Sequence, residues 1–379
     1  MRILFLVRSL DLGGAERQMV AVARGLRDRG HQVSIAVFYG GGPFEAELRA
    51  AGISVHDLRK RGRWEAARFL ARLAALVHSV RPDVLHAYME ANVFAAAVKP
   101  LCPRVKVLWG IRTAKADLGA YDRLSRLYPL LERAASRLAD GIIVNSDAAR
   151  RQAIANGLDG ARIAVVPNGI DCEAFRPDAE GRARTRARWG IGDDRVLVGL
   201  VARLDPVKDH PNFIRAAARV AAVRPEASFV CIGNPSARPE YRRRLGELAI
   251  ELGLGDRLTW VEEGKVSREV YGALDVAVLS SGAGESFPNV LGEAMACGKA
   301  TVTTDSGDAA AVVGDTGAVA PVHDDEALAR GILSTVERLP VTGPWLEQPR
   351  ARIESKYSVE SLARRTEEAL ARFGVGGSR

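Results

Sequence analysis

The chain alternates short apolar runs with stretches in which apolar residues recur at helical spacing. The apolar runs predict strands at residues 2–7, 32–38, 82–87, 105–111, 139–146, 163–166, 196–201, 229–233, 258–262 and 275–280. Helical spacing occupies the intervals, most clearly at residues 18–27, 65–80, 181–189, 211–223 and 358–373. Because runs that are apolar on both faces are typical of parallel strands covered by helices, the pattern predicts an α/β fold. A length of 379 residues suits two such domains.

The stretch of residues 284–298 carries the clearest local signal. Pro288 suits a first helical position, Ser286 suits the capping position before it, and Gly298 is placed to end the helix. The free N–H groups of the first turn would then point out of the helix start, which is a common site for phosphate.

Two acids flank this helix start, Glu285 before it and Glu293 on it. Carboxylates accept hydrogen bonds from sugar and ribose hydroxyls, so the arrangement suits a phosphorylated sugar. On spacing alone, an ordinary surface helix with two solvated acids explains the pattern equally well.

Two other places favour an anion. Gly13 and Gly14 join the first strand to a helix and would let backbone N–H groups approach a phosphate, although a plain tight turn fits as well. Arg203 and Lys208 lie between a strand and a helix, where two cations suit a diphosphate. Solvated surface charge is the alternative for that pair.

The E-x7-E spacing of Glu285 and Glu293 resembles the signature of retaining glycosyltransferases of family 4. Residues 13–17 (Gly-Gly-Ala-Glu-Arg) and 167–171 (Pro-Asn-Gly-Ile-Asp) are similar to that family as well. The resemblance implies the GT-B fold, in which two Rossmann-like domains face a central cleft.

The same resemblance implies the division of the chain. Residues 1–170 are expected to form the acceptor-side domain and residues 171–357 the nucleotide-sugar domain. The final helix, residues 358–373, is expected to pack back on the first domain.

By the resemblance, the catalytic residues are Arg203 and Lys208, which stabilise the leaving diphosphate, and Glu285, which holds hydroxyls of the transferred sugar. Glu293 is expected to hold the ribose. The full set expected to bind the donor is Gly13, Gly14, Arg203, Lys208, Gly233, Asn234, Glu285, Phe287, Pro288, Asn289, Val290 and Glu293. The sequence has no Asp-x-Asp, so we expect no obligatory metal and no cofactor besides the nucleotide sugar.

Candidates on the acceptor side are His86, Glu90 and Arg112, which fall near the ends of predicted strands. Several members of the family carry a histidine near the end of the strand 105–111, where this chain has Gly-Ile-Arg-Thr at residues 110–113. An arginine would stabilise a phosphate or an anionic acceptor, but it stays protonated and is a poor general base. Which group takes the proton of the acceptor is therefore left open.

The charge is uneven along the chain. Residues 1–170 carry 26 Lys and Arg against 15 Asp and Glu, whereas residues 171–379 carry 28 against 31, within a formal net charge of +8. A basic first half indicates an anionic partner, for which a membrane surface or a phosphorylated lipid ranks before nucleic acid. The basic run 59–63 beside Trp64 leads into a helix that would lie either on a membrane or in the core.

Together these features predict a metal-independent hexosyltransferase or N-acetylhexosaminyltransferase. By the resemblance, it would move a sugar, with retention, from a nucleotide diphosphate sugar to a cell-envelope polysaccharide or a lipid-linked saccharide. Uridine is the commonest base among relatives, and guanosine is the alternative. The four scattered cysteines and the absence of a signal peptide or an apolar run of ~20 residues favour a cytoplasmic protein, with a peripheral place on the plasma membrane as an option. A nucleotide-sugar epimerase and a non-catalytic nucleotide-sugar sensor of the same fold are the alternatives.

Overall fold

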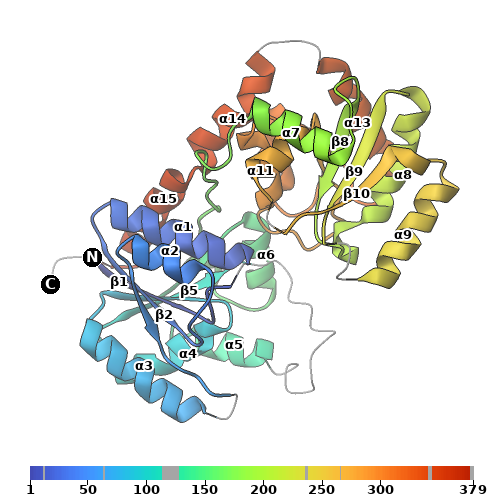
Figure 1. The fold of residues 1–379 in the computed structure, drawn as a ribbon. Helices are drawn as coiled ribbons and strands as arrows, with labels where there is room; N and C mark the ends of the chain where they lie inside the picture. The colour runs from blue at the N-terminus through green and yellow to red at the C-terminus, as the bar shows by residue number, and fades with distance from the viewer. Residues whose placement is uncertain are drawn as a thin grey trace. The chain divides into compact units, whose positions relative to one another are not determined.

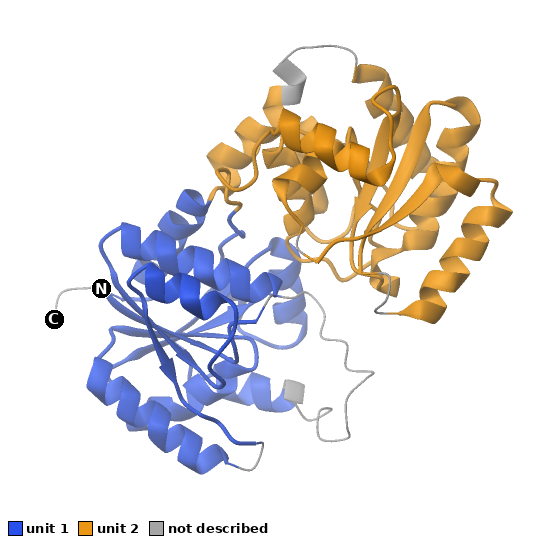
Figure 2. Ribbon diagram, in the orientation of Figure 1, with its two compact units in different colours: residues 1–169, 359–379 blue, residues 170–358 orange. Residues whose placement is uncertain are grey.

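The computed structural model describes residues 1–375 except 12, 63–64, 113–127, 235–237, 265 and 340–343. The chain divides into two compact units, each containing one parallel sheet (Figures 1 and 2). Unit 1 comprises residues 1–169 and 359–379, and unit 2 comprises residues 170–358.

Unit 1 contains a seven-stranded sheet in the order β3-β2-β1-β4-β5-β6-β7. Its strands are β1 (Arg2–Val7), β2 (Gln32–Val37), β3 (Ser54–Asp57), β4 (Val84–Tyr88), β5 (Lys106–Ile111), β6 (Gly141–Val144) and β7 (Ile163–Val165). Its helices are α1 (Gly14–Asp28), α2 (Phe44–Ala50), α3 (Ala66–Val80), α4 (Ala91–Val98), α5 (Tyr128–Ser136), α6 (Asp147–Ala155) and α15 (Val359–Arg372).

Both faces of this sheet are buried, which explains the unbroken apolar runs. Along β1, Leu4 and Leu6 face one core with residues of α3, α4 and α6, whereas Phe5 and Val7 face a second core with α1, α2 and α15. Successive side chains of a strand point to opposite faces, so both alternating sets of positions in β1 are apolar from Ile3 to Val7.

Unit 2 repeats the architecture with six strands in the order β10-β9-β8-β11-β12-β13. These strands are β8 (Val196–Val201), β9 (Ala227–Gly233), β10 (Leu258–Glu262), β11 (Val276–Leu279), β12 (Ala300–Thr304) and β13 (Ala318–Ala320). The helices are α7 (Ala179–Trp189), α8 (His210–Val223), α9 (Pro239–Glu251), α10 (Arg268–Ala273), α11 (Asn289–Ala296), α12 (Ala309–Val313), α13 (Asp325–Arg338) and α14 (Pro344–Tyr357).

The last helix, α15, belongs to unit 1 although it follows unit 2 in the chain. Leu362 and Leu370 join the same core as residues of α1, and a Cβ added at Gly25 of α1 would lie 2.7 Å from the Cβ of Ala363. A small residue at that position therefore lets α1 and α15 approach closely.

Each sheet reverses its strand order once, between β1 and β4 in unit 1 and between β8 and β11 in unit 2. Ligands of open α/β sheets bind outside the carboxyl ends of the strands at such a switch point. The segments that follow these four strands are therefore the first places to examine.

The predicted α/β architecture with two Rossmann-like sheets is confirmed. Of the two interpretations of the helix after Trp64, the core-packing one is correct, because Phe69, Leu73 and Val77 of α3 are buried in unit 1. Arg63 and Trp64 lie outside the described residues. Within the described ranges, no helix combines the length and the hydropathy that a membrane crossing needs.

Candidate functional site

The switch point of unit 2 is bordered by two loops, the β8–α8 loop (residues 202–209) and the β11–α11 loop (residues 280–288). In the β8–α8 loop, the Asp205 side chain accepts a hydrogen bond from the N–H of Val207 and starts a short 3-10 turn that ends at Lys208. Asp209 then caps α8. This local hydrogen bonding fixes the backbone that carries Lys208.

Lys208 and Glu285 join the two loops. The ammonium of Lys208 forms an ion pair with Oε1 of Glu285, and the hydroxyl of Ser281 donates to the same oxygen at 2.6 Å. The two charged side chains are 20% and 11% exposed. No described residue hydrogen-bonds the second carboxylate oxygen, Oε2, which leaves it able to accept a hydroxyl.

Arg203 is exposed and comes two residues after the end of β8. Its guanidinium forms no ion pair or hydrogen bond with any residue that the structure describes. It is therefore available to an anionic ligand, whereas the positive charge of Lys208 already faces a carboxylate.

The start of α11 differs from the prediction. Pro288 is the N-cap with extended backbone, the helix begins at Asn289, and Ser286, two residues before the N-cap, is 7% exposed. The prediction of Pro288 at the first helical position was wrong by one residue, because the extended turn of Pro288 precedes the first helical dihedral angles. Asn289 and Val290 are the first helical residues, and both are partly exposed.

The predicted end of α11 is confirmed. Gly298 has a φ of 70°, its N–H donates to Met295, and the N–H of Lys299 donates to Ala294. This pair of bonds is a Schellman motif, whose left-handed residue favours glycine.

Glu293 lies inside unit 2. It is 3% exposed, and the hydroxyl of the buried Tyr271 donates to its Oε2 at 2.7 Å. Phe287 is also buried, and its ring lies edge-on to that of Tyr357 with 5.4 Å between the ring centres, so its side chain anchors the loop.

Gly233 ends β9, and a Cβ there would lie 2.2 Å from the carbonyl oxygen of Ala202. The glycine thus lets the ends of β8 and β9 approach each other. Asn234, the next residue, is exposed.

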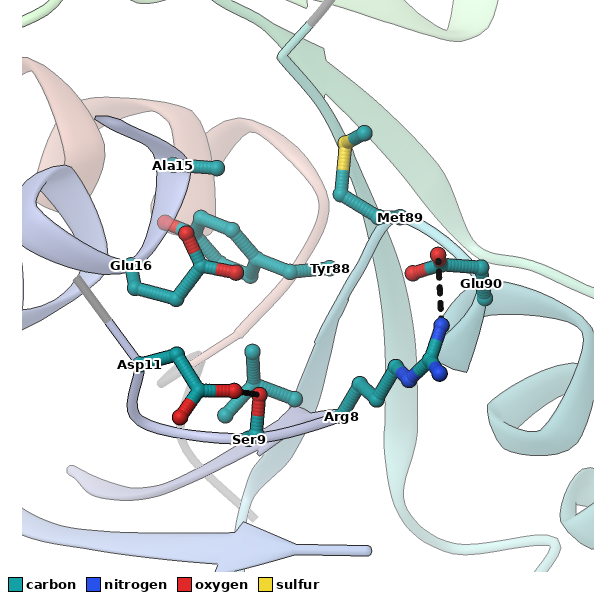
Figure 3. A pocket seen from close by; sticks show the side chains of 9 residues that line it. Arg8, Ser9, Asp11, Ala15, Glu16, Tyr88, Met89 and Glu90 are labelled. Carbon is teal, nitrogen blue, oxygen red and sulfur yellow. Dashed lines mark hydrogen bonds and ion pairs between the residues drawn. The ribbon is translucent and has the colours of Figure 1, made fainter. Parts of the chain in front are cut away.

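Unit 1 has a pocket of about 260 Å³ at its own switch point (Figure 3). It lies beyond the carboxyl ends of β1 and β4, beside the first turn of α1. Its lining residues are Val7, Arg8, Ser9, Asp11, Ala15, Glu16, Tyr88, Met89 and Glu90. Three carboxylates against one guanidinium give this lining a negative charge.

The polar groups of the pocket are partly paired with one another. Ser9 donates to Asp11 at 2.5 Å, and Arg8 forms a long ion pair of 3.6 Å with Glu90 (Figure 3). Met89 has a φ of 54°, an uncommon conformation for a residue with a side chain. Such strain gathers where a fold positions a binding site.

Glu16 changes the interpretation of the two glycines. A Cβ added at Gly13 would lie 2.0 Å from Oε2 of Glu16, so this carboxylate folds over Gly13 at the start of α1. Gly13 is the N-cap and Gly14 is the exposed first residue of the helix. An anion that approached Gly13 would have to displace the carboxylate. Burial raises the pKa of Glu16, and the charges of Glu90 and Asp11 raise it further.

Two of the three acceptor-side candidates do not line this pocket, whereas Glu90 does. His86 is fully buried, and neither of its ring nitrogens has a partner among the described residues. Burial, with the charge of Arg112, lowers its pKa to about 3. His86 is therefore a neutral core residue, because the strand carries its side chain into the interior next to Phe5 and Tyr88.

Arg112 is 7% exposed and contacts Tyr88, which lines the pocket. Its guanidinium donates to the Tyr88 hydroxyl at 2.8 Å and to Oδ1 of Asn168 at 3.1 Å, and its central carbon lies 4.9 Å from the centre of the Tyr88 ring. It orients a lining residue and does not face the cavity itself.

Sequence reasoning missed Asp11, Glu16 and Tyr88 in unit 1, and Tyr271 and Ser281 in unit 2. Asp11 and Ser281 could have been found because they follow strand ends, and Tyr88 because it is the last residue of β4. Nothing in the pattern indicated Tyr271. In the part of the chain that the structure describes, no three His, Cys, Asp or Glu side chains are grouped so that they could hold a metal.

Two family models match the chain. Residues 12–174 match the model described as Glycosyltransferase Family 4, and residues 181–340 match the model described as Glycosyl transferases group 1. The two matches follow the two units closely.

Among curated proteins, the D-inositol 3-phosphate glycosyltransferase of Mycobacteroides abscessus is 34% identical over 200 residues, which cover 51% of this chain and 44% of that protein. The match thus spans less than half the length of that relative.

Among solved structures, HepE of Anabaena in complex with UDP has a TM-score of 0.84 at 23% identity, and the match covers 98% of this chain and 100% of the HepE chain. The complex of HepE with UDP-glucose has a TM-score of 0.80, also at 23% identity, with the same coverage.

Proposed function

Because the chain belongs to glycosyltransferase family 4 and has the GT-B fold, we propose that it transfers a sugar from a nucleoside diphosphate sugar to a hydroxyl group of an acceptor. The observation that carries the proposal is the Lys208–Glu285 ion pair at the switch point of unit 2. It sets a cation and a carboxylate side by side where an open α/β sheet binds its ligand.

Lys208 and Arg203 are proposed to stabilise the leaving diphosphate. Negative charge grows on the diphosphate as the bond to the sugar breaks, and positioned cations act most strongly on charge that develops in the transition state. The first turn of α11, at Asn289 and Val290, would add backbone N–H groups to the same anion. Since these groups supply the positive charge, we expect turnover to survive removal of divalent metal with EDTA.

Glu285 is proposed to hold the transferred sugar. Its Oε1 is occupied by Lys208 and Ser281, and its Oε2 is left for a sugar hydroxyl. A carboxylate in that position would also stabilise an oxocarbenium-like transition state, in keeping with transfer under retention. Glu293, held by Tyr271, would take the ribose hydroxyls through its small exposed part.

The sugar donor is proposed to be a UDP-sugar. HepE has been crystallised with UDP and with UDP-glucose, and its fold matches this chain over nearly its whole length. The experiment below compares three nucleotides to identify the base.

The pocket of unit 1 is proposed to take the acceptor. Its carboxylates and hydroxyls suit the hydroxyl groups of a saccharide or a polyol. A cell-envelope polysaccharide or a lipid-linked saccharide supplies such groups. A peripheral place of the protein at an anionic membrane surface stays a prediction that rests on the charge of residues 1–170.

The first experiment measures thermal stability with UDP, GDP and ADP, because a ligand that binds only the folded state raises the melting temperature. The nucleotide that stabilises the protein then defines the radiolabelled sugar nucleotide for assays with free saccharides, inositol and a membrane lipid extract.

Label that reaches an acceptor supports transfer, and the anomeric configuration of the product decides retention. A changed sugar on an intact nucleotide would point to epimerisation. Tight binding without any turnover would point to a sensor. Either of these results would overturn the proposed transfer.

A further inference from the structure

Two residues of unit 2 contact each other while both hold a left-handed backbone. His323, three residues after β13, has a φ of 59°, and Asp209 at the start of α8 has a φ of 47°. Nδ1 of His323 lies 2.6 Å from Oδ2 of Asp209. Left-handed backbone is uncommon for residues with a Cβ, although Asp and His adopt it more readily than most. The contact between the two side chains joins the segment after β13 to the start of α8.

The third partner of His323 is the backbone of Gly282 in the β11–α11 loop. A Cβ added at Gly282 would lie 2.2 Å from Cε1 of His323 and 2.9 Å from its Nε2. The imidazole thus lies directly against the loop, in space that any other residue at position 282 would fill. Gly282 follows Ser281, whose hydroxyl holds Glu285.

His323 reaches both loops of the site at the place where they are joined. The N–H of Gly282 donates to the carbonyl of Val207 at 3.0 Å, and the hydroxyl of Ser280 donates to the carbonyl of Lys208 at 2.8 Å. Asp209 follows Lys208 directly in the chain. The imidazole consequently contacts the residue after Lys208 and the residue after Ser281 at once.

We propose that His323 is a positioning residue of the donor site. By bonding Asp209 and covering Gly282, it holds Lys208 and Glu285 in the relative position that the leaving diphosphate requires. The role of His323 in catalysis rests on the proposed function, whereas the contact of His323 with the two loops does not. A displacement of about 1 Å in a catalytic group lowers turnover by as much as about 100-fold, so a modest shift of the loops should be measurable.

The decisive variant is His323→Gly. Glycine adopts the left-handed backbone without strain, which offsets the lost contact and the greater entropy of the unfolded chain, so the melting temperature should change little. Turnover with UDP-glucose, or the sugar nucleotide that stabilises the protein most, should fall about tenfold with little change in KM, because Lys208 acts on charge that forms during bond breaking. His323→Asn should recover part of the turnover, since asparagine tolerates this backbone and its amide can donate to Asp209. Unchanged turnover in His323→Gly overturns the proposal.

Gly282→Ala tests the same contact from the other side. Its methyl group would push the imidazole off the loop, so turnover should fall about as far as in His323→Gly. In the His323→Gly background the methyl group has room, and Gly282→Ala should then change little. Effects that simply add in the double variant would mean that the two residues act separately, which contradicts the proposal.

A measurement without any substrate separates this inference from the proposed function. Amide hydrogen exchange should be faster at residues 207–209 and 280–285 in both single variants, while exchange in strand β4 of unit 1 should stay the same. Equal exchange in the wild type and the variants would overturn the positioning role. If the wild type transfers no sugar but the exchange changes as expected, the proposed function fails and the contact between the loops stands.

Discussion

The two units share the same strand order over six strands, to which unit 1 adds β7, but they surround their switch points with different chemistry. Unit 1 lines a pocket with three carboxylates and one guanidinium, whereas unit 2 brings Lys208, Arg203 and Glu285 to two loops beside the start of α11. The same arrangement of parallel strands therefore provides a binding location in both units, and the side chains that follow the strands decide what binds there.

The comparison also shows how little the net charge of a segment says about its site. Residues 1–170 carry an excess of Lys and Arg, which predicted an anionic partner for this half. The pocket in the same unit has the opposite sign, because Asp11, Glu16 and Glu90 follow the strand ends. If this pocket takes the proposed acceptor, it should favour neutral or amino-bearing molecules over phosphorylated ones.

Loss of the cation in unit 2 should have the largest effect. Lys208→Ala is expected to lower turnover by about 100- to 1,000-fold with a small change in donor KM, because the leaving diphosphate loses its positioned charge. Steady-state kinetics check this, with Lys356→Ala as the control, since Lys356 is an exposed lysine of the same unit. Full turnover in Lys208→Ala would remove the residue from catalysis.

Neutralising the carboxylate of Glu285, the ion-pair partner of Lys208, should have the next largest effect. Glu285→Gln keeps the shape of the side chain but removes the charge, and turnover at saturating sugar donor should fall about 100-fold. Ser281→Ala deletes only the hydrogen bond to Glu285, so a loss of about five- to tenfold is expected. If Ser281→Ala costs as much as Glu285→Gln, the hydroxyl must have a role of its own.

The acidic pocket of unit 1 should discriminate between acceptors by charge. A neutral polyol such as inositol should be used at least about fivefold more efficiently than its monophosphate, because like charges a few ångströms apart repel by about 1 kcal/mol even in water. The preference should shrink at high salt and in Glu90→Gln. Competition assays with both acceptors measure it, and a preference for the phosphate ester would contradict the assignment of this pocket.

The smallest effect concerns stability and pH. Burial raises the pKa of Glu16, with further contributions from Glu90 and Asp11, so the folded state keeps this proton to a higher pH than the unfolded state does. The free energy of unfolding should then fall as the pH rises from about 4.3 through the raised pKa. Glu16→Gln should consequently raise the melting temperature near pH 8 and leave it unchanged near pH 3. Equal curves for both proteins across this range would exclude the effect.

Apolar periodicity and turn chemistry determined much of this protein directly. The unbroken runs at β1, β8 and β11 predicted parallel strands because both of their faces are covered, and Gly298 predicted the end of α11 because its backbone is left-handed. The sequence also identified Lys208 and Glu285 as candidates, although 77 positions separate them.

Tertiary structure alone decided which side chains meet. It buried His86 in the core, and it brought His323 against Gly282 and Asp209 across segments far apart in the chain. Local patterns specify the dihedral angles and the buried face of one element at a time. Contacts at a switch point depend on how several strand ends are brought together, and the packing of the sheets and helices determines that.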